Sequence, residues 1–296
     1  MCLTKVLSKY FSSWFSWSVL FMSIAGFFLA SSWITVWMFL ELAMMSVFPW
    51  LNTGILTYFI VQSVSSILFI YAILTNEKYF IIFSLVIKLG LFPFSFWVPL
   101  VINKSSWLGG LMLSSFLKIA PLTIFFSLDM KNSEMLTIMS VLWASFYGCY
   151  QTKVKMVLAY SSIIHTSWLF MLFVSKPENF LFYIFFYFFF TIMMFSLSFG
   201  SFSNYWSNMN HNKFPLMVVI LTISGMPPFS GFWFKLLLIK TFSLNWGIFA
   251  LLGLLASSAS MFFYLKLISS LILQLEKNFS YLMAMIALFM TPLFYI

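Results

Sequence analysis

The sequence predicts an all-α membrane protein with about eleven transmembrane helices, because a spanning helix and its turn use about 27 residues. Of the 296 residues, 63% are hydrophobic and only 7% are charged. The mean hydropathy is +1.04. A soluble domain is usually about half apolar and about one quarter charged. The composition therefore excludes a soluble enzyme and a disordered protein.

Polar, glycine and proline residues interrupt the hydrophobic segments at intervals and mark the predicted loops. The clearest loops are 76–78 and 129–134, whereas only Ser31 and Ser32 separate the first two helices. The predicted helices span 12–30, 33–51, 54–75, 79–99, 107–128, 134–150, 156–175, 179–203, 214–241, 245–270 and 279–296. Together they form a single polytopic membrane domain over residues 1–296.

Loop charge predicts the orientation of the chain. All fifteen cationic side chains are lysine. Lysines on the amino-terminal side of the predicted helices are Lys5, Lys9, Lys104, Lys153, Lys155, Lys213, Lys266 and Lys277, and those on the other side are Lys78, Lys131, Lys176 and Lys240. Since positive charge gathers on the cytoplasmic or matrix side, the amino terminus is expected there.

Several other functions are excluded by what the sequence lacks. Cys2 and Cys149 lie far apart, so there is no disulfide framework and no metal-ligand spacing. No basic run suits nucleic acid, so no nucleic-acid partner is expected. Without a glycine-rich nucleotide loop, a cysteine cluster or a haem ligand pair, no cofactor is expected in this chain. Lys5 and Lys9 before a hydrophobic stretch resemble the start of a signal peptide. Because the rest of the chain is equally hydrophobic, the stretch is predicted to be a retained first helix.

Two proline segments resemble each other and predict two broken helices. Residues 93–97, which begin with Pro93, read PFSFW, and residues 228–233, which begin with Pro228, read PFSGFW after Pro227. A helical proline removes one hydrogen bond and clashes with the preceding turn. Lipid tolerates such a break only inside protein or beside a wet cavity. Paired breaks in inverted repeats point to a transport path; the alternative is a chance echo in a phenylalanine-rich chain.

Five ionisable residues lie well inside predicted helices. A charge at the bilayer centre costs about 2.5–3.5 kcal/mol, so such groups are expected to face the protein interior and to have a role. For a lysine the alternative is that it snorkels to the interface. For the histidine the alternative is an ordinary hydrogen-bonded core residue. The five residues are Glu41, Lys88, Lys118, His165 and Lys235.

These buried groups suggest a proton relay. Loss of water favours the neutral form of a lysine, and a nearby carboxylate favours the charged form. Glu41 and Lys88 are therefore predicted to form a pair whose separation releases a proton, with Lys118 and Lys235 continuing the relay. His165 is a possible further member, with Ser161 and Ser162 on its helical face.

Together these segments resemble the NADH–ubiquinone oxidoreductase chain 2 family, the mitochondrially encoded antiporter-like subunits of respiratory complex I. The resemblance runs from about residue 30 to residue 240 and is carried by 32–41, 88–99, 118–121, 159–165 and 225–232. It implies an antiporter-like fold that lacks three amino-terminal helices, in the mitochondrial inner membrane, with the amino terminus in the matrix. One departure is Ser95, where many relatives have histidine.

The resemblance also implies a function and partners. It assigns Glu41, Lys88, Lys118 and Lys235 to proton translocation driven by redox chemistry elsewhere in an NADH:ubiquinone reductase. NADH, flavin, Fe–S clusters and ubiquinone are expected in the parent complex. Expected partners are the other membrane-arm subunits, including neighbouring antiporter-like chains, and lipids such as cardiolipin. Two alternatives remain open: a monovalent cation/proton antiporter subunit and a structural scaffold of the membrane arm.

Overall fold

Most of the described backbone satisfies its hydrogen bonds within helices, as lipid requires. The computed structural model describes residues 2–51, 53–128, 134–175, 177–198, 213–227, 229–233, 235–236, 240 and 247–272. Apart from turns and one isolated bridge between Leu51 and Ser105, these described residues are helical. The chain divides into two compact units, Met1–Met130 and Lys131–Ile296. One polytopic membrane domain over residues 1–296 stays a prediction.

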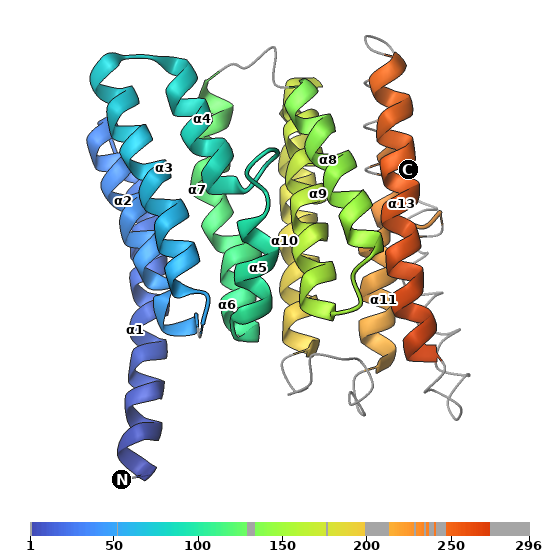
Figure 1. Ribbon diagram of the computed structural model, residues 1–296, viewed down its shortest axis with the longest axis horizontal. Helices are drawn as coiled ribbons and strands as arrows, with labels where there is room; N and C mark the ends of the chain where they lie inside the picture. Colours follow the sequence, from blue (N-terminus) through green and yellow to red (C-terminus); the bar gives the residue numbers. More distant parts are fainter. Residues whose placement is uncertain are drawn as a thin grey trace. The chain divides into compact units, whose positions relative to one another are not determined.

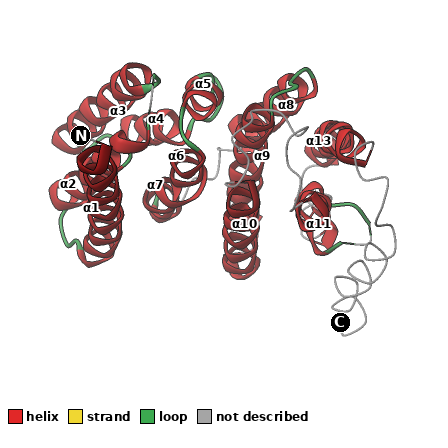
Figure 2. Ribbon diagram, turned by 90° about the horizontal axis from the view of Figure 1, so that it is seen from below, coloured by secondary structure: helices red, strands yellow, loops and turns green. Residues whose placement is uncertain are grey.

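The first unit is a bundle of helices that Figure 1 shows side by side and Figure 2 shows nearly end-on. Its described elements are α1 (Cys2–Leu29), α2 (Trp33–Ser46), the 3₁₀ turn η1 (Phe48–Trp50), α3 (Ile55–Thr75), α4 (Lys78–Leu89), α5 (Trp97–Lys104), α6 (Trp107–Leu111), the π segment η2 (Met112–Phe116) and α7 (Leu117–Ser127). Helix α1 packs on α2 and α3 packs on α4, while α7 contacts α1, α2 and α4. The core of this unit lies between these helices.

Local polar residues set the ends of several helices in the first unit. The Ser32 hydroxyl accepts a hydrogen bond from the Thr35 amide, and the Thr35 side chain accepts one from the Ser32 amide. This capping box starts α2 at Trp33 and confirms the predicted boundary at Ser31 and Ser32. Asn76 ends α3 in the left-handed conformation, with φ 57°. Helix α1 begins at Cys2, ten residues before the predicted start, because no glycine or proline interrupts residues 2–12.

The predicted helix 79–99 is divided in the structure. Helix α4 ends at Leu89, and Gly90 follows with φ 68°, a conformation that favours glycine. A Cβ atom there would overlap Val98. The chain then passes Pro93 in a non-helical turn and resumes as α5 from Trp97 to Lys104. The predicted end at residue 99 is wrong, since the interruption shifts the helix end to Lys104.

The second unit contains five described helices, which also run side by side (Figure 1). They are α8 (Glu134–Cys149), α9 (Val154–Ser175), α10 (Pro177–Ser198), α11 (Lys213–Ser224) and α13 (Gly247–Ile272). Helix α8 packs on α9 and α13, and α10 packs on α9 and α11. Each matches a predicted helix within a few residues, except where the prediction continues past Ser198 and Ser224. Residues 199–203 and the predicted helix 279–296 lie outside the described residues.

The second proline segment also follows the end of a helix. Helix α11 stops at Ser224, and Gly225 adopts φ 69°, close to the value at Gly90. Pro227 lies in a turn, and helical residues resume at Ser230, while Pro228 lies outside the described residues. The predicted helix 214–241 is therefore interrupted near its middle.

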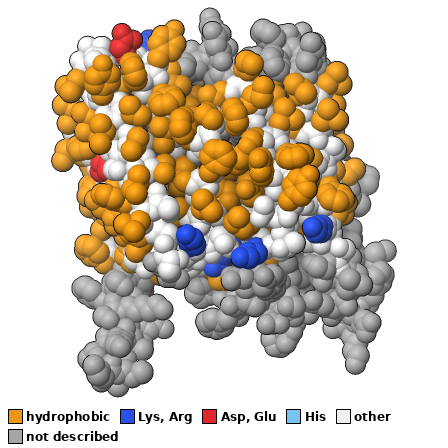
Figure 3. Space-filling view, in the orientation of Figure 1, with side chains coloured by type: hydrophobic (Ala, Val, Ile, Leu, Met, Phe, Trp, Pro, Cys, Tyr) orange, Lys and Arg blue, Asp and Glu red, His pale blue; other side chains and the backbone are white. Residues whose placement is uncertain are grey.

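Large apolar side chains cover the outside of both units. Figure 3 shows such side chains over most of the face that it draws. Trp14 is 76% exposed and Leu56 is 74% exposed, which suits a lipid surface better than water. Among the described residues, four helical stretches are long and apolar enough to cross a membrane: Trp33–Trp50, Ile55–Thr75, Trp107–Phe125 and Leu251–Ser269. Shorter apolar helices accompany them.

Candidate functional site: buried charges at two helix interruptions

The structure brings the predicted pair of Glu41 and Lys88 together inside the first unit. The Lys88 Nζ lies 3.4 Å from the Glu41 Oε1 and donates a hydrogen bond to it. Glu41 is in the middle of α2, and Lys88 is in the last turn of α4. The Lys88 side chain is 5% exposed and the Glu41 side chain 20%. A cation in the last turn of a helix is also stabilised by the helix dipole.

Trp97 stabilises the interruption that follows Lys88. When α4 ends at Leu89, its last carbonyls lose their helical partners. The indole Nε1 of Trp97 donates a 3.0 Å hydrogen bond to the Ile87 carbonyl, and the Leu91 amide donates to the Val86 carbonyl. The tryptophan of the PFSFW segment therefore adds a second donor to the Ile87 carbonyl, which also accepts a hydrogen bond from the Gly90 amide.

We expect Trp97→Phe to destabilise the assembled protein by about 0.5–1.5 kcal/mol, because the Ile87 carbonyl loses the indole donor and keeps only the Gly90 amide. Loss of assembled complex on heating would measure this effect. The matched control is Trp233→Phe, since Trp233 ends the second proline segment and is 39% exposed. Equal stability of the two variants would contradict the assigned role of the Trp97 indole.

Lys118 lies where the helix that carries it is irregular. The π segment Met112–Phe116 comes directly before α7, and the hydroxyls of Ser114 and Ser115 both donate to the Leu111 carbonyl. Pro121 lies inside α7 and removes the hydrogen bond that the Leu117 carbonyl would otherwise accept. Single π turns often mark functional sites. Lys118 is only 4% exposed, so its amine does not snorkel to the surface of the unit.

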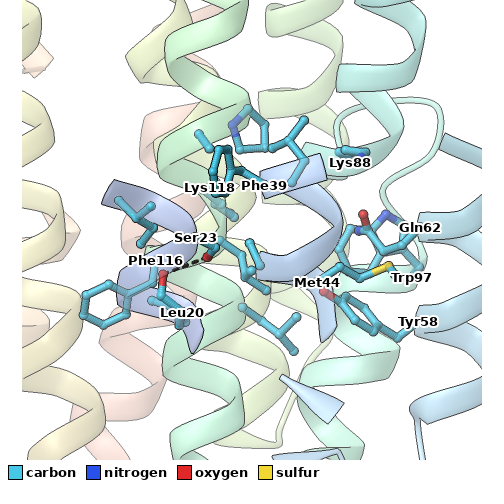
Figure 4. Close-up of a pocket in the computed structure, with 17 residues that line it drawn as sticks. Leu20, Ser23, Phe39, Met44, Tyr58, Gln62, Lys88, Trp97, Phe116 and Lys118 are labelled. Atoms are coloured by element: carbon cyan, nitrogen blue, oxygen red, sulfur yellow. Dashed lines mark hydrogen bonds between the residues drawn. The ribbon is translucent and has the colours of Figure 1, made fainter. Parts of the chain in front are cut away.

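One cavity of about 30 Å³ connects the surroundings of Lys88 and Lys118. Both lysines line it, together with three neutral polar side chains, Ser23, Tyr58 and Gln62. Figure 4 shows these residues around the cavity, contributed by α1, α3, α4 and α7. A buried water needs about 10–15 Å³ and two to four polar partners. The cavity has both the room and the polar lining to hold water between the two amines.

Tyr58 and Ser23 belong to this cavity but were not predicted from the sequence. Tyr58 precedes Gln62 by four residues on α3, and Gln62 precedes Ser66 by four, so all three share one face. That spacing could have indicated Tyr58 in the sequence, because it extends the polar stripe of Gln62 and Ser66 by one turn. Ser23 carried no signal, since its hydroxyl donates to the Leu20 carbonyl as in many membrane serines.

Lys235 occupies a different position at the second interruption. Its Nζ donates a 2.5 Å hydrogen bond to the carbonyl of Ser224, the last residue of α11. Lys235 is 5% exposed. A Cβ atom on Gly225 would lie 2.8 Å from the Lys235 Cε, so the glycine leaves space for the lysine chain. Here the lysine amine, rather than an indole, completes the backbone at the break.

His165 lies within the second unit, in the middle of α9. It is 6% exposed, and its Nδ1 is 2.7 Å from the Tyr183 hydroxyl on α10. Its ring also stands 5.2 Å from the Tyr187 ring, centroid to centroid. His165 is therefore a hydrogen-bonded buried residue, and a role in the relay stays a prediction.

The predicted site residues thus fall into two groups. In the first unit, the structure pairs Glu41 with Lys88 and places Lys88 and Lys118 on one cavity. The second unit contains His165 and Lys235. Ser95 is fully buried, and its hydroxyl has no hydrogen bond in the part of the chain that is described. Within the same described residues, no group of three or more His, Cys, Asp or Glu side chains could hold a metal ion.

Interrupted helices with charged side chains held inside the bundle define an antiporter-type membrane protein. The family model of the NADH:quinone oxidoreductase/Mrp antiporter transmembrane region matches residues 7–263. The chain therefore belongs to the NADH:quinone oxidoreductase/Mrp antiporter family and is, within it, an antiporter-type membrane subunit like chain 2 of complex I.

Individual relatives and solved structures agree with this assignment. The chain is 31% identical over 280 residues to NADH-ubiquinone oxidoreductase chain 2 of Dugong dugon, covering 82% of this chain and 80% of that protein. Its fold is similar to a chain of respiratory complex I from Thermus thermophilus, with TM-score 0.74, 20% identity, and coverage of 88% and 70%. It is also similar to a chain of the Mrp complex from Dietzia, with TM-score 0.72, 13% identity, and coverage of 85% and 59%.

Proposed function

We propose that this subunit carries protons across the membrane as part of the membrane arm of an NADH:ubiquinone reductase. The single observation that supports this most directly is the cavity shared by Lys88 and Lys118, with Glu41 paired to Lys88. Two amines on one polar cavity suit proton exchange through water, because each can bind or release a proton when its surroundings change.

The first step of the proposed path is the separation of Glu41 from Lys88. While the carboxylate is 3.4 Å from the amine, it stabilises the ammonium form. When the carboxylate moves away, the ammonium remains in a poorly solvated position and releases its proton. Glu41 is the more exposed partner, so it is the group with more freedom to change its surroundings.

The second step takes the proton through the cavity to Lys118. Tyr58, Gln62 and Ser23 provide donors and acceptors that orient water between the two amines. Lys118 then carries the charge in the irregular part of the helix, at α7. We propose that Lys235 continues the relay in the second unit and that His165 assists it.

The proposed function implies partner subunits and a cellular location. Its redox partners lie in other subunits, where NADH, flavin, Fe–S clusters and ubiquinone act, and this chain itself needs no cofactor. Neighbouring antiporter-like chains and cardiolipin contact its apolar surface. Its place is the mitochondrial inner membrane with the amino terminus in the matrix, as the loop lysines suggest and as fits the mammalian relatives.

The proposed function is tested by the ratio of protons translocated to NADH oxidised in the reconstituted complex. The chain should copurify with NADH-oxidising activity. We expect the double variant Lys88→Met and Lys118→Met to lose proton translocation while the complex remains assembled. An unchanged ratio in this variant would instead identify the chain as a structural scaffold with lysines in static contacts.

A monovalent cation/proton antiporter is the second candidate, because the family and the fold of the Dietzia Mrp chain are compatible with it. It predicts that transport in vesicles depends on sodium or potassium. Translocation that is driven by NADH and independent of both ions would favour the main proposal.

A further inference from the structure

Helix α10 carries two buried tyrosines on one face, in a segment that is otherwise rich in phenylalanine. Residues 185–190 read FFYFFF, and Tyr183 and Tyr187 are four residues apart, so they share a face. Both tyrosines are 2% exposed, whereas Phe185 is 73% exposed and Phe189 is 46% exposed. The two hydroxylated rings therefore point into the second unit, whereas Phe185 and Phe189 point outward.

The two hydroxyls meet polar groups from two neighbouring helices. Tyr183 shares a 2.7 Å hydrogen bond with the His165 Nδ1, and Tyr187 is hydrogen-bonded to Ser162 on α9. Tyr264 on α13 is buried and interacts electrostatically with both Tyr183 and Tyr187. Three helices thus bring three tyrosines, one histidine and one serine into a buried cluster without a lysine or a carboxylate among its members.

Tyr264 is the informative member of this cluster. Its hydroxyl faces Ser161 but makes no hydrogen bond of ordinary distance and angle within the described part of the chain. The Ser161 and Ser162 protons are already donated to the carbonyls of Leu158 and Ala159. A buried hydroxyl without a hydrogen bond costs about 1–3 kcal/mol and calls for an explanation. Stabilisation of the fold does not explain it.

We infer that Tyr183, Tyr187 and Tyr264, with His165, form a neutral hydrogen-bonded path for protons through the second unit. Hydroxyl and imidazole groups both donate and accept hydrogen bonds, so each can receive a proton on one side while it passes its own proton onward. One proton enters the chain of groups for each proton that leaves, and no group keeps a charge. Histidine is also the side chain that titrates nearest to neutral pH.

The path depends on the orientation of the hydroxyl groups. In one step, His165 takes up a proton at Nε2 and passes its Nδ1 proton to the Tyr183 oxygen. Tyr183 releases its own proton to the next hydroxyl, which passes its proton onward in turn. Within the described residues the Tyr264 hydroxyl has no hydrogen bond to break, so it can turn between its neighbours. This inference rests on the proposed function, because it assumes that the complex translocates protons.

The test removes single oxygen atoms. We expect Tyr183→Phe and Tyr264→Phe to lower the number of protons translocated per NADH oxidised as strongly as Lys118→Met does, with NADH oxidation and assembly retained. Tyr264→Phe should not lower thermal stability, since its hydroxyl makes no hydrogen bond to any residue that the structure describes. The matched control is Tyr150→Phe in the same unit, because Tyr150 is 68% exposed.

The outcomes separate this inference from the proposed function. If Lys118→Met loses translocation while both tyrosine variants keep it, the hydroxyl path is wrong and the proposed function stands. If all of these variants keep translocation, both are wrong. A loss in Tyr264→Phe without a loss of stability supports the path, because a purely structural role of the cluster would not produce it.

Discussion

Lys118→Met is expected to abolish proton translocation and leave the complex assembled. Methionine is unbranched and adaptable, so it fills the buried space of the lysine chain without its charge. Removing a positioned proton carrier typically slows proton transfer by about 10²-fold or more. The measurement is the acidification of reconstituted vesicles during NADH oxidation, compared with electron transfer in the same sample.

The control for this experiment is Lys78→Met. Lys78 begins α4, is exposed, and lies ten residues before Lys88 on the same helix. It has the same chemistry as Lys118 but does not line the cavity. An unchanged proton-to-electron ratio in Lys118→Met would remove this lysine from the path.

Gly225→Ala is expected to have the second-largest effect, because it disturbs the contact between Lys235 and the end of α11. An alanine at φ 69° costs about 1–2 kcal/mol. Its Cβ would also lie 2.8 to 3.0 Å from the Cε, Cδ and Nζ of Lys235, and this would push the amine away from the Ser224 carbonyl. We expect severe loss of proton translocation, measured in the same vesicle assay.

Gly54→Ala provides the comparison. A Cβ on Gly54 would have its nearest neighbour at 3.5 Å, an ordinary contact, and the residue has φ −92°. This variant should translocate protons normally. Normal translocation in Gly225→Ala as well would show that the position of the Lys235 amine does not matter.

Most of the helices could be predicted because apolar runs and their polar interruptions are strong signals in a membrane chain. Errors arose where local chemistry shifts a boundary. The chain resumes its helix only at Trp97 and then continues to Lys104, beyond the predicted end at residue 99. The early start of α1 at Cys2 was missed because Lys5 and Lys9 were assigned to a loop.

The site was predictable only in part. The depth of Glu41 and Lys88 inside their predicted helices suggested that they pair, and the structure places them 3.4 Å apart. The cavity could not be predicted, because it depends on how α1, α2, α3, α4 and α7 pack, and periodicity along one helix contains no such information. The carbonyl partner of Lys235 was missed for a similar reason, since side-chain direction at a break does not follow helical spacing.

The two helix interruptions differ in which groups donate hydrogen bonds to the last carbonyls of the preceding helix. At the first one, the Trp97 indole and two backbone amides donate to the last carbonyls of α4, so Lys88 can lose its partner without the loss of a main-chain hydrogen bond. At the second one, the Lys235 amine that would carry the charge also donates the hydrogen bond to the last carbonyl of α11. If that amine moves away, the Ser224 carbonyl loses its hydrogen bond. Movement of the charge and a change at the end of α11 would therefore occur together.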